Sequence, residues 1–227
     1  MRRFPVMLFA AGFGTRMGAL TKDRPKPMIP VAGKALLDHA LDLCTADLVT
    51  HRVVNLHYLG DQIARHLSGR DVALSREDPI LDTGAGLRAA LPLLGSGPVM
   101  TLNTDAVWTG ENPLVELAAA WDDRRMDALL LVAEVQNAPG HRGTGDFLID
   151  SDGRLTRAEG APGVVYLGAQ ILCTHRLVRV SQQAFSLNLI WDQMIAEGRA
   201  FGRLHRGGWC DVGQPDSIAL AEALLHD

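Results

Sequence analysis

Apolar and polar positions alternate along this chain in two ways. Short apolar runs are typical of buried strands, and apolar residues three or four positions apart are typical of helices that pack on a sheet. The runs predict strands over residues 6–11, 51–57, 72–75, 99–103, 128–135, 164–173 and 199–205. The helical spacing predicts helices over residues 35–46, 59–67, 85–94, 112–125, 187–196 and 216–225.

Strands and helices alternate as far as residue 135, which favours an α/β fold with a doubly wound, mostly parallel, Rossmann-like sheet. The pattern then changes to a polar, glycine-rich loop over residues 137–147 and a short hairpin over residues 147–157. We therefore expect a small antiparallel extension of the sheet. A chain of 227 residues suits one domain, 1–227, with a first half over residues 1–135 and a second half over residues 136–227.

The loop after the first strand has the composition of a phosphate-binding loop. Gly12 and Gly14 allow a tight turn whose backbone N–H groups approach an anion. Arg16 adds a planar cation suited to phosphate oxygens, and Lys26 adds a second cation between two prolines that restrict its backbone. A dinucleotide fingerprint does not fit, because Met17 stands where the third glycine is required. No Gly-Lys-Ser/Thr follows the glycines, so this is not a Walker loop either.

Composition excludes several kinds of partner. A net charge of −4 offers no basic field for nucleic acid or an anionic membrane, and an aromatic content of 5 % offers little for base stacking. No apolar run is long enough to span a bilayer. Three widely spaced cysteines without a CxxC motif are typical of reduced thiols. We expect a cytoplasmic protein with small-molecule substrates, no nucleic-acid or membrane partner, and a monomeric or small homo-oligomeric state.

Two linked segments resemble a known signature. Ala10-Ala11-Gly12-Phe13-Gly14-Thr15-Arg16-Met17, followed by Pro25-Lys26-Pro27-Met28-Ile29-Pro30-Val31, is similar to the signature of the sugar-1-phosphate nucleotidyltransferases. Further similarities follow in Leu81-Asp82-Thr83-Gly84 and in Trp209-Cys210-Asp211-Val212-Gly213, so that the resemblance covers essentially the whole chain. It implies the nucleotide-diphospho-sugar transferase fold, with a nucleotide-binding first half and a sugar-binding second half.

The resemblance also implies roles for individual residues. Arg16 and Lys26 are the expected catalytic cations, and Asp105 and Asp211 are the expected ligands of Mg²⁺, the expected cofactor. Independently, an aspartate just after a buried strand stands where open α/β sheets place ligand chemistry, as Asp105 does. The expected nucleotide-binding residues are Ala10, Ala11, Gly12, Gly14, Thr15, Glu77, Thr83 and Gly84, with Glu77 and Gly84 near the base. The expected sugar-binding residues are Asn103, Arg142, Gly145, Asp146 and Glu159.

The loop over residues 137–147 narrows the expected substrates. Its Asn-x-Pro-Gly-His-x-Gly-x-Gly-Asp-Phe run resembles the short N-acetylmuramate 1-phosphate uridylyltransferases of bacterial cell-wall recycling, which implies UTP and N-acetylmuramate 1-phosphate as substrates. Two departures from the wider family stand out. Glu159 is not followed by the family's lysine, and Thr104 replaces the family's glycine before Asp105. A mannose 1-phosphate guanylyltransferase, another sugar-1-phosphate nucleotidyltransferase or a non-catalytic nucleotide-sugar sensor remain alternatives.

Overall fold

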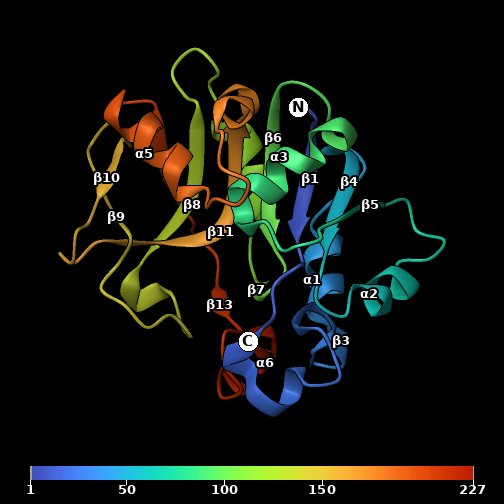
Figure 1. Ribbon diagram of the computed structural model, residues 1–227. Coiled ribbons are helices and arrows are strands. Elements are labelled where there is room, and N and C mark those ends of the chain that lie inside the picture. Colours follow the sequence, from blue (N-terminus) through green and yellow to red (C-terminus); the bar gives the residue numbers. More distant parts are fainter. Residues whose placement is uncertain (1, 227) are drawn as a thin grey trace.

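A computed structural model describes residues 2–226, and its centre is a nine-stranded sheet within that range (Figure 1). The parallel part runs in the order β6-β1-β4-β5, and β11 joins it to the antiparallel part by pairing with β6, β8 and β9. The last strand of this sheet in sequence, β12, lies parallel to β8 at one edge. The strands are β1 (Phe4–Phe9), β4 (Val49–Leu56), β5 (Ala73–Arg76), β6 (Pro98–Asn103), β8 (Ala128–Glu134), β9 (Phe147–Ile149), β10 (Leu155–Arg157), β11 (Val164–Cys173) and β12 (Ala200–Leu204).

Helices cover both faces of the sheet, as the alternation of strands and helices predicts. On β1, Val6 and Leu8 point into one core and Met7 into another, because successive side chains of a strand face opposite sides. The first core is closed by α1 (Leu36–Asp42), α2 (Gly60–His66) and α4 (Pro113–Ala120), and the second by α3 (Asp82–Leu94) and α5 (Asn188–Ala196). The predicted doubly wound architecture is therefore confirmed.

Three predicted helices have clearly different bounds in the structure, and the one expected over residues 35–46 ends at Asp42. The helix expected over residues 112–125 ends at Ala120, where Trp121 adopts an extended conformation and Asp122 accepts a turn hydrogen bond from the N–H of Arg124. The helix expected from residue 85 begins at Asp82 instead. Its glycines therefore lie inside the helix rather than in a turn before it. Glycine is needed at Gly84 and Gly86 because neighbouring side chains occupy the space that a Cβ atom would need.

A small subdomain lies beyond the carboxyl ends of β1 and β6, at the bottom of Figure 1. It contains the two-stranded sheets β7 (Ala106–Trp108) with β13 (Trp209–Asp211) and β2 (Pro30–Val31) with β3 (Lys34–Ala35), the helix α6 (Ser217–His226), and the 3₁₀ segments η1 (Thr15–Thr21) and η2 (Lys26–Met28). Met17, Val107, Val212 and Ala221 form its buried core. Strands of two or three residues are too short to produce a readable period, which explains why the sequence pattern did not predict them.

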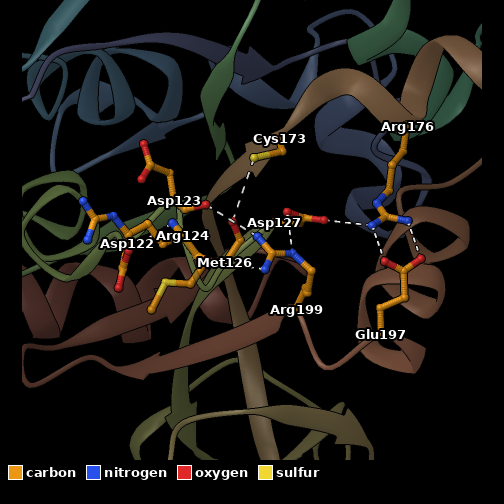
Figure 2. Close-up of polar contacts among 9 residues, drawn as sticks. All are labelled: Asp122, Asp123, Arg124, Met126, Asp127, Cys173, Arg176, Glu197 and Arg199. Atoms are coloured by element: carbon orange, nitrogen blue, oxygen red, sulfur yellow. Dashed lines mark hydrogen bonds and ion pairs between the residues drawn. The ribbon is translucent and has the colours of Figure 1, made fainter.

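An ion-pair cluster joins segments at the end of the sheet that lies opposite the small subdomain (Figure 2). Asp127, next to β8, accepts hydrogen bonds from Arg176 of η4 (Thr174–Arg179) and from Arg199 before β12, both at 2.8 Å. Arg176 also contacts both carboxylate oxygens of Glu197. The cluster therefore joins three segments that are distant in sequence. Within residues 2–226, no helix is long and apolar enough to cross a membrane.

Candidate active site

A cavity of about 320 Å³ opens where the parallel strand order reverses, between β1 and β6. Its walls come from the residues that follow β1, from those that follow β6, and from the start of α3. Ligands of open α/β sheets bind at such a reversal, outside the carboxyl ends of the strands. The fold alone therefore marks this cavity as the place for chemistry.

The glycine-rich loop forms one wall and is held from several sides. Gly14 has φ +64°, and a Cβ atom there would lie 2.8 Å from the Cβ of Lys26, so only glycine fits without strain. The hydroxyl of Thr21 donates to the carbonyl of Gly14 at 3.0 Å. The hydroxyl of Tyr58 donates to the carbonyl of Thr21 at 2.8 Å and so fixes the far end of the loop. These contacts preorganise the loop before any ligand arrives.

Lys26 lies deep in the cavity wall. It is 8 % exposed, and its Nζ donates to Oδ2 of Asp105 at 2.7 Å. Asp105 is the second residue after β6, so the end of a buried strand fixes its position. A buried ammonium and a carboxylate at this distance neutralise each other.

Asp211 reaches the same place through the small β7–β13 sheet. It pairs with Ala106 across that sheet, and the N–H of Val212 donates to the carbonyl of Asp105 at 2.8 Å. A Cβ atom on Gly213 would lie 2.6 Å from Oδ2 of Asp211 and 3.2 Å from a guanidinium nitrogen of Arg16, so both groups flank this glycine. The site therefore gathers two carboxylates and two cations from four separate segments.

The carboxyl of Asp211 has an unusual environment. Burial raises its pKa, and the negative charge of Asp105 raises it further, although Lys26 and Arg16 oppose the shift. The ionised form of Asp211 is therefore less stable here than that of a solvent-exposed aspartate. A cation between the two carboxylates would relieve this repulsion.

The donor set suits Mg²⁺ better than a metal that requires an all-protein cage. Within residues 2–226, no group of three or more histidine, cysteine or acidic side chains is arranged to hold a metal ion. Asp105 and Asp211 offer hard oxygen ligands beside the cavity, and Mg²⁺ commonly takes one or two carboxylates and completes its shell with water and phosphate oxygens. The residues present thus fit the expected cofactor.

The structure brings most of the predicted nucleotide-binding and catalytic residues to this cavity. Its lining contains Ala10, Ala11, Gly12, Gly14, Thr15, Arg16, Lys26, Thr83, Asn103 and Asp105. It also contains residues that the sequence reasoning missed, namely Phe9, Pro27, Asn55, Ile80, Asp82, Thr104 and Gly213. Thr104 has a visible role where the family carries glycine, because its hydroxyl donates to the carbonyl of Phe9 at 2.7 Å and ties β6 to β1.

Two residues expected near the base lie behind the cavity wall. Gly84 and Ala85 both donate their backbone N–H groups to the carbonyl of Phe185, at 2.9 and 3.1 Å. The ring of Phe185 lies 2.4 Å from where a Cβ of Gly84 would stand. The start of α3 is thus capped by the protein itself rather than left free for a ligand. Glu77 is buried, at 5 % exposure, and both of its carboxylate oxygens accept hydrogen bonds from protein donors rather than facing the cavity.

The predicted sugar-binding residues separate in space. Asn103 lines the cavity, whereas Gly145, Asp146, Glu159 and Arg142 do not. Asp146 accepts a hydrogen bond from the N–H of Tyr166 at 2.8 Å, and Arg142 forms an exposed ion pair with Asp216 at 2.9 Å. Their contacts in this structure are therefore structural ones, and any direct role toward a sugar remains a prediction.

Comparison with known proteins identifies the family of this chain. Residues 6–184 match the MobA-like NTP transferase domain. The chain belongs to this family. It is 39 % identical to the N-acetylmuramate alpha-1-phosphate uridylyltransferase of Caulobacter vibrioides, with 97 % of this chain and 96 % of the relative covered. It is 30 % identical to the protein of that name from Neisseria meningitidis, with 96 % of each chain covered. Both relatives confirm the resemblance to the sugar-1-phosphate nucleotidyltransferases.

More distant relatives and solved structures agree on the class. The mannose-1-phosphate guanyltransferase beta-B of Xenopus laevis is 26 % identical, and 92 % of this chain covers 61 % of that protein. HddC from Yersinia pseudotuberculosis superposes with a TM-score of 0.79 at 21 % identity, over 98 % of this chain and 99 % of that one. A UDP-glucose pyrophosphorylase complexed with UDP-glucose superposes with a TM-score of 0.78 at 15 % identity, over 99 % of each chain. The two structures confirm the fold, and the family and its relatives make the protein a sugar-1-phosphate nucleotidyltransferase.

Proposed function

We propose that the enzyme transfers a uridylyl group from UTP to N-acetylmuramate 1-phosphate, releasing pyrophosphate, with Mg²⁺ as cofactor. The observation that carries this proposal is the similarity to the Caulobacter vibrioides uridylyltransferase, 39 % identity over 97 % of the chain. The guanyltransferase relative is less similar and is matched over only 61 % of its length. The proposed reaction belongs to cell-wall recycling in the cytoplasm.

The site supports an in-line transfer without a strong base. An oxygen of the sugar 1-phosphate attacks the α-phosphorus of the nucleotide, the new O–P bond forms, and the bond to the β-phosphate breaks as pyrophosphate leaves. The attacking oxygen is already ionised, so catalysis consists of positioning and charge neutralisation. Arg16 flanks the glycine-rich loop and is placed to neutralise the β- and γ-phosphates and the departing pyrophosphate.

Lys26 is the proposed bridge between the two phosphates that react. It lines the cavity at the junction of the glycine-rich loop and Asp105, and this position supports a role for its ammonium at both the nucleotide and the sugar phosphate. Asp105 and Asp211 would hold Mg²⁺, which supplies charge neutralisation at the phosphate oxygens when bound. Asn103, at the end of β6, is the one predicted sugar contact on the cavity wall among the described residues.

A substrate panel tests the proposal. Pyrophosphate release is measured with Mg²⁺ for UTP, GTP, CTP, ATP and dTTP against the 1-phosphates of N-acetylmuramate, N-acetylglucosamine, glucose and mannose. We expect selective turnover of UTP with N-acetylmuramate 1-phosphate. Selective turnover of GTP with mannose 1-phosphate would replace the proposal by the guanylyltransferase alternative. Size-exclusion chromatography tests the expected monomer or small homo-oligomer.

A further inference from the structure

Glu77 is a buried carboxylate that accepts hydrogen bonds from two donors on different segments. Oε1 accepts from the side-chain amide of Asn55 at 2.7 Å, and Oε2 accepts from the backbone N–H of Leu81 at 3.0 Å. Glu77 has no salt bridge to any residue between 2 and 226. A glutamine would present an amide nitrogen to one of these two donors, so a carboxylate is the group that satisfies both.

Asn55 connects Glu77 to the phosphate-binding loop. Its Oδ1 accepts from the backbone N–H of Ala10 at 2.6 Å, and the side chain is buried and lines the cavity. Ala10 is the first residue after β1, where the glycine-rich loop begins. Since the bond to Glu77 requires the amide nitrogen of Asn55, it turns the amide oxygen toward Ala10. Glu77 thereby fixes the orientation of a side chain in the cavity.

The second contact of Glu77 holds the facing wall. The N–H of Leu81 lies between Ile80 and Asp82, and both of these neighbours line the cavity. Gly86 of α3 leaves the space that the carboxylate occupies, since a Cβ atom there would lie 2.5 Å from Oε1 of Glu77. One buried carboxylate thus sets the relative position of two walls that come from residues 10–16 and residues 80–83.

We propose that Glu77 is a positioning residue that acts through Asn55 on the Ala10 N–H and through Leu81 on the facing wall, and that it makes no contact of its own with the nucleotide. The proposal goes beyond the transfer reaction and assigns roles to Glu77, Asn55 and Gly86 as one unit. It holds for whichever nucleotide the enzyme uses.

The test exchanges the two functional groups of the pair. In Asn55→Asp two carboxylates face each other. In Glu77→Gln the new amide nitrogen faces one of the two donors, either the Asn55 amide or the Leu81 N–H. In the double variant Asn55→Asp/Glu77→Gln the new amide donates to the new carboxylate, which still accepts from Ala10, while the amide oxygen accepts from Leu81. We expect each single variant to raise the KM for the nucleotide about 10-fold with a smaller change in kcat. We expect the double variant to return within about 3-fold of the wild-type KM.

Controls separate positioning from stability and from direct contact. Asp78→Asn removes the neighbouring exposed carboxylate and should leave the KM unchanged. KM is measured for the nucleotide that the wild-type enzyme uses best, so the result does not depend on that nucleotide being UTP. Thermal melts without nucleotide report folding. Lower Tm values with an unchanged KM in the single variants would make the network purely structural and overturn the proposal.

A folded double variant whose KM stays as high as that of Glu77→Gln would show that Glu77 contacts the nucleotide itself. Gly86→Ala provides a second route, because it displaces Oε1 without changing the chemistry of Glu77 or Asn55. We expect it to raise the KM in the same direction, and an unchanged KM in the folded variant would contradict the proposal. If both single variants fail to fold, the double variant is compared with wild type alone: a KM within about 3-fold of wild type supports the proposal, and a KM raised about 10-fold contradicts it.

Discussion

The ammonium of Lys26 donates a hydrogen bond to the carboxylate of Asp105, with Nζ 2.7 Å from Oδ2. The same two side chains are the proposed phosphate bridge and the proposed metal ligand. A bound nucleotide and its metal ion would therefore each take over one partner of an existing pair. Arg16 and Asp211 lie alongside, so that each of the two cations has a carboxylate nearby.

Removing the ammonium of Lys26 should mainly affect catalysis. We expect Lys26→Met to lower kcat/KM by about 100-fold or more, which corresponds to the loss of one preorganised charge contact at the reacting phosphates. The matched control is Lys34→Met, since Lys34 also pairs with an aspartate, Asp42, but on an exposed surface outside the cavity lining. Steady-state pyrophosphate release compares the two. Equal activity of both variants would remove Lys26 from its assigned role.

Asp105 and Asp211 should be required for turnover but not for folding. We expect Asp105→Asn and Asp211→Asn each to abolish Mg²⁺-dependent turnover while circular dichroism stays unchanged, because a neutral amide is a poor ligand for a hard cation. Asp211→Asn should also raise the Tm of the ligand-free enzyme at pH 7. Burial raises the pKa of Asp211 in the fold, so its ionised form costs stability at neutral pH. Turnover within a few-fold of wild type would contradict the assignment of either ligand.

The cluster around Asp127 predicts a pH-dependent part of the stability (Figure 2). Burial alone would raise the pKa of Asp127, but the hydrogen bonds and charges of Arg176 and Arg199 outweigh it and hold this pKa below its usual value. A carboxyl whose pKa is lowered by folding stabilises the fold above its unfolded-state pKa, about 3.9 for aspartate, and loses that effect as the pH falls through the folded-state pKa. Asp127→Asn should therefore cost about 3 kcal/mol at pH 7, and this cost should decrease progressively as the pH falls from about 4 through the folded-state pKa.

Urea unfolding of wild type and Asp127→Asn at pH 7 and at pH 3 measures this effect. The control is Asp152→Asn, which breaks an exposed pair with Arg154 and should change the free energy of unfolding by no more than about 0.5 kcal/mol. A penalty for Asp127→Asn that is the same at both pH values would show that the ionised carboxylate is not the source of the stabilisation.

The start of α3 should not tolerate a methyl group at residue 84. Alanine in a helix interior is normally favoured over glycine by about 1 kcal/mol. At Gly84, however, the new Cβ would meet the Phe185 ring at 2.4 Å, and we expect Gly84→Ala to destabilise the protein by about 1–3 kcal/mol. In a Phe185→Ala background the same change should cost less than about half as much, because the ring is gone. Equal penalties in both backgrounds, measured by denaturant unfolding, would exclude the ring as the cause.

The sequence by itself determined the parts of this protein that are continuous along the chain. The apolar run before Gly12 predicts β1, and the linked glycine and Pro-Lys-Pro segments predict the loop that carries Arg16 and Lys26. Asp105 could be placed because it follows a buried strand whose end is fixed by the sheet. These inferences need only local periodicity and short motifs.

Only the tertiary structure decided which distant groups meet. The β7–β13 pairing brings Asp211 beside Asp105, although strands of three residues leave no period in the sequence. Glu77 is buried between Asn55 and Leu81, and the amides at the start of α3 bind Phe185 rather than a ligand. A motif specifies residue types and spacing along the chain. Whether a polar group faces the cavity or another part of the protein depends on which long-range partner satisfies its hydrogen bonds.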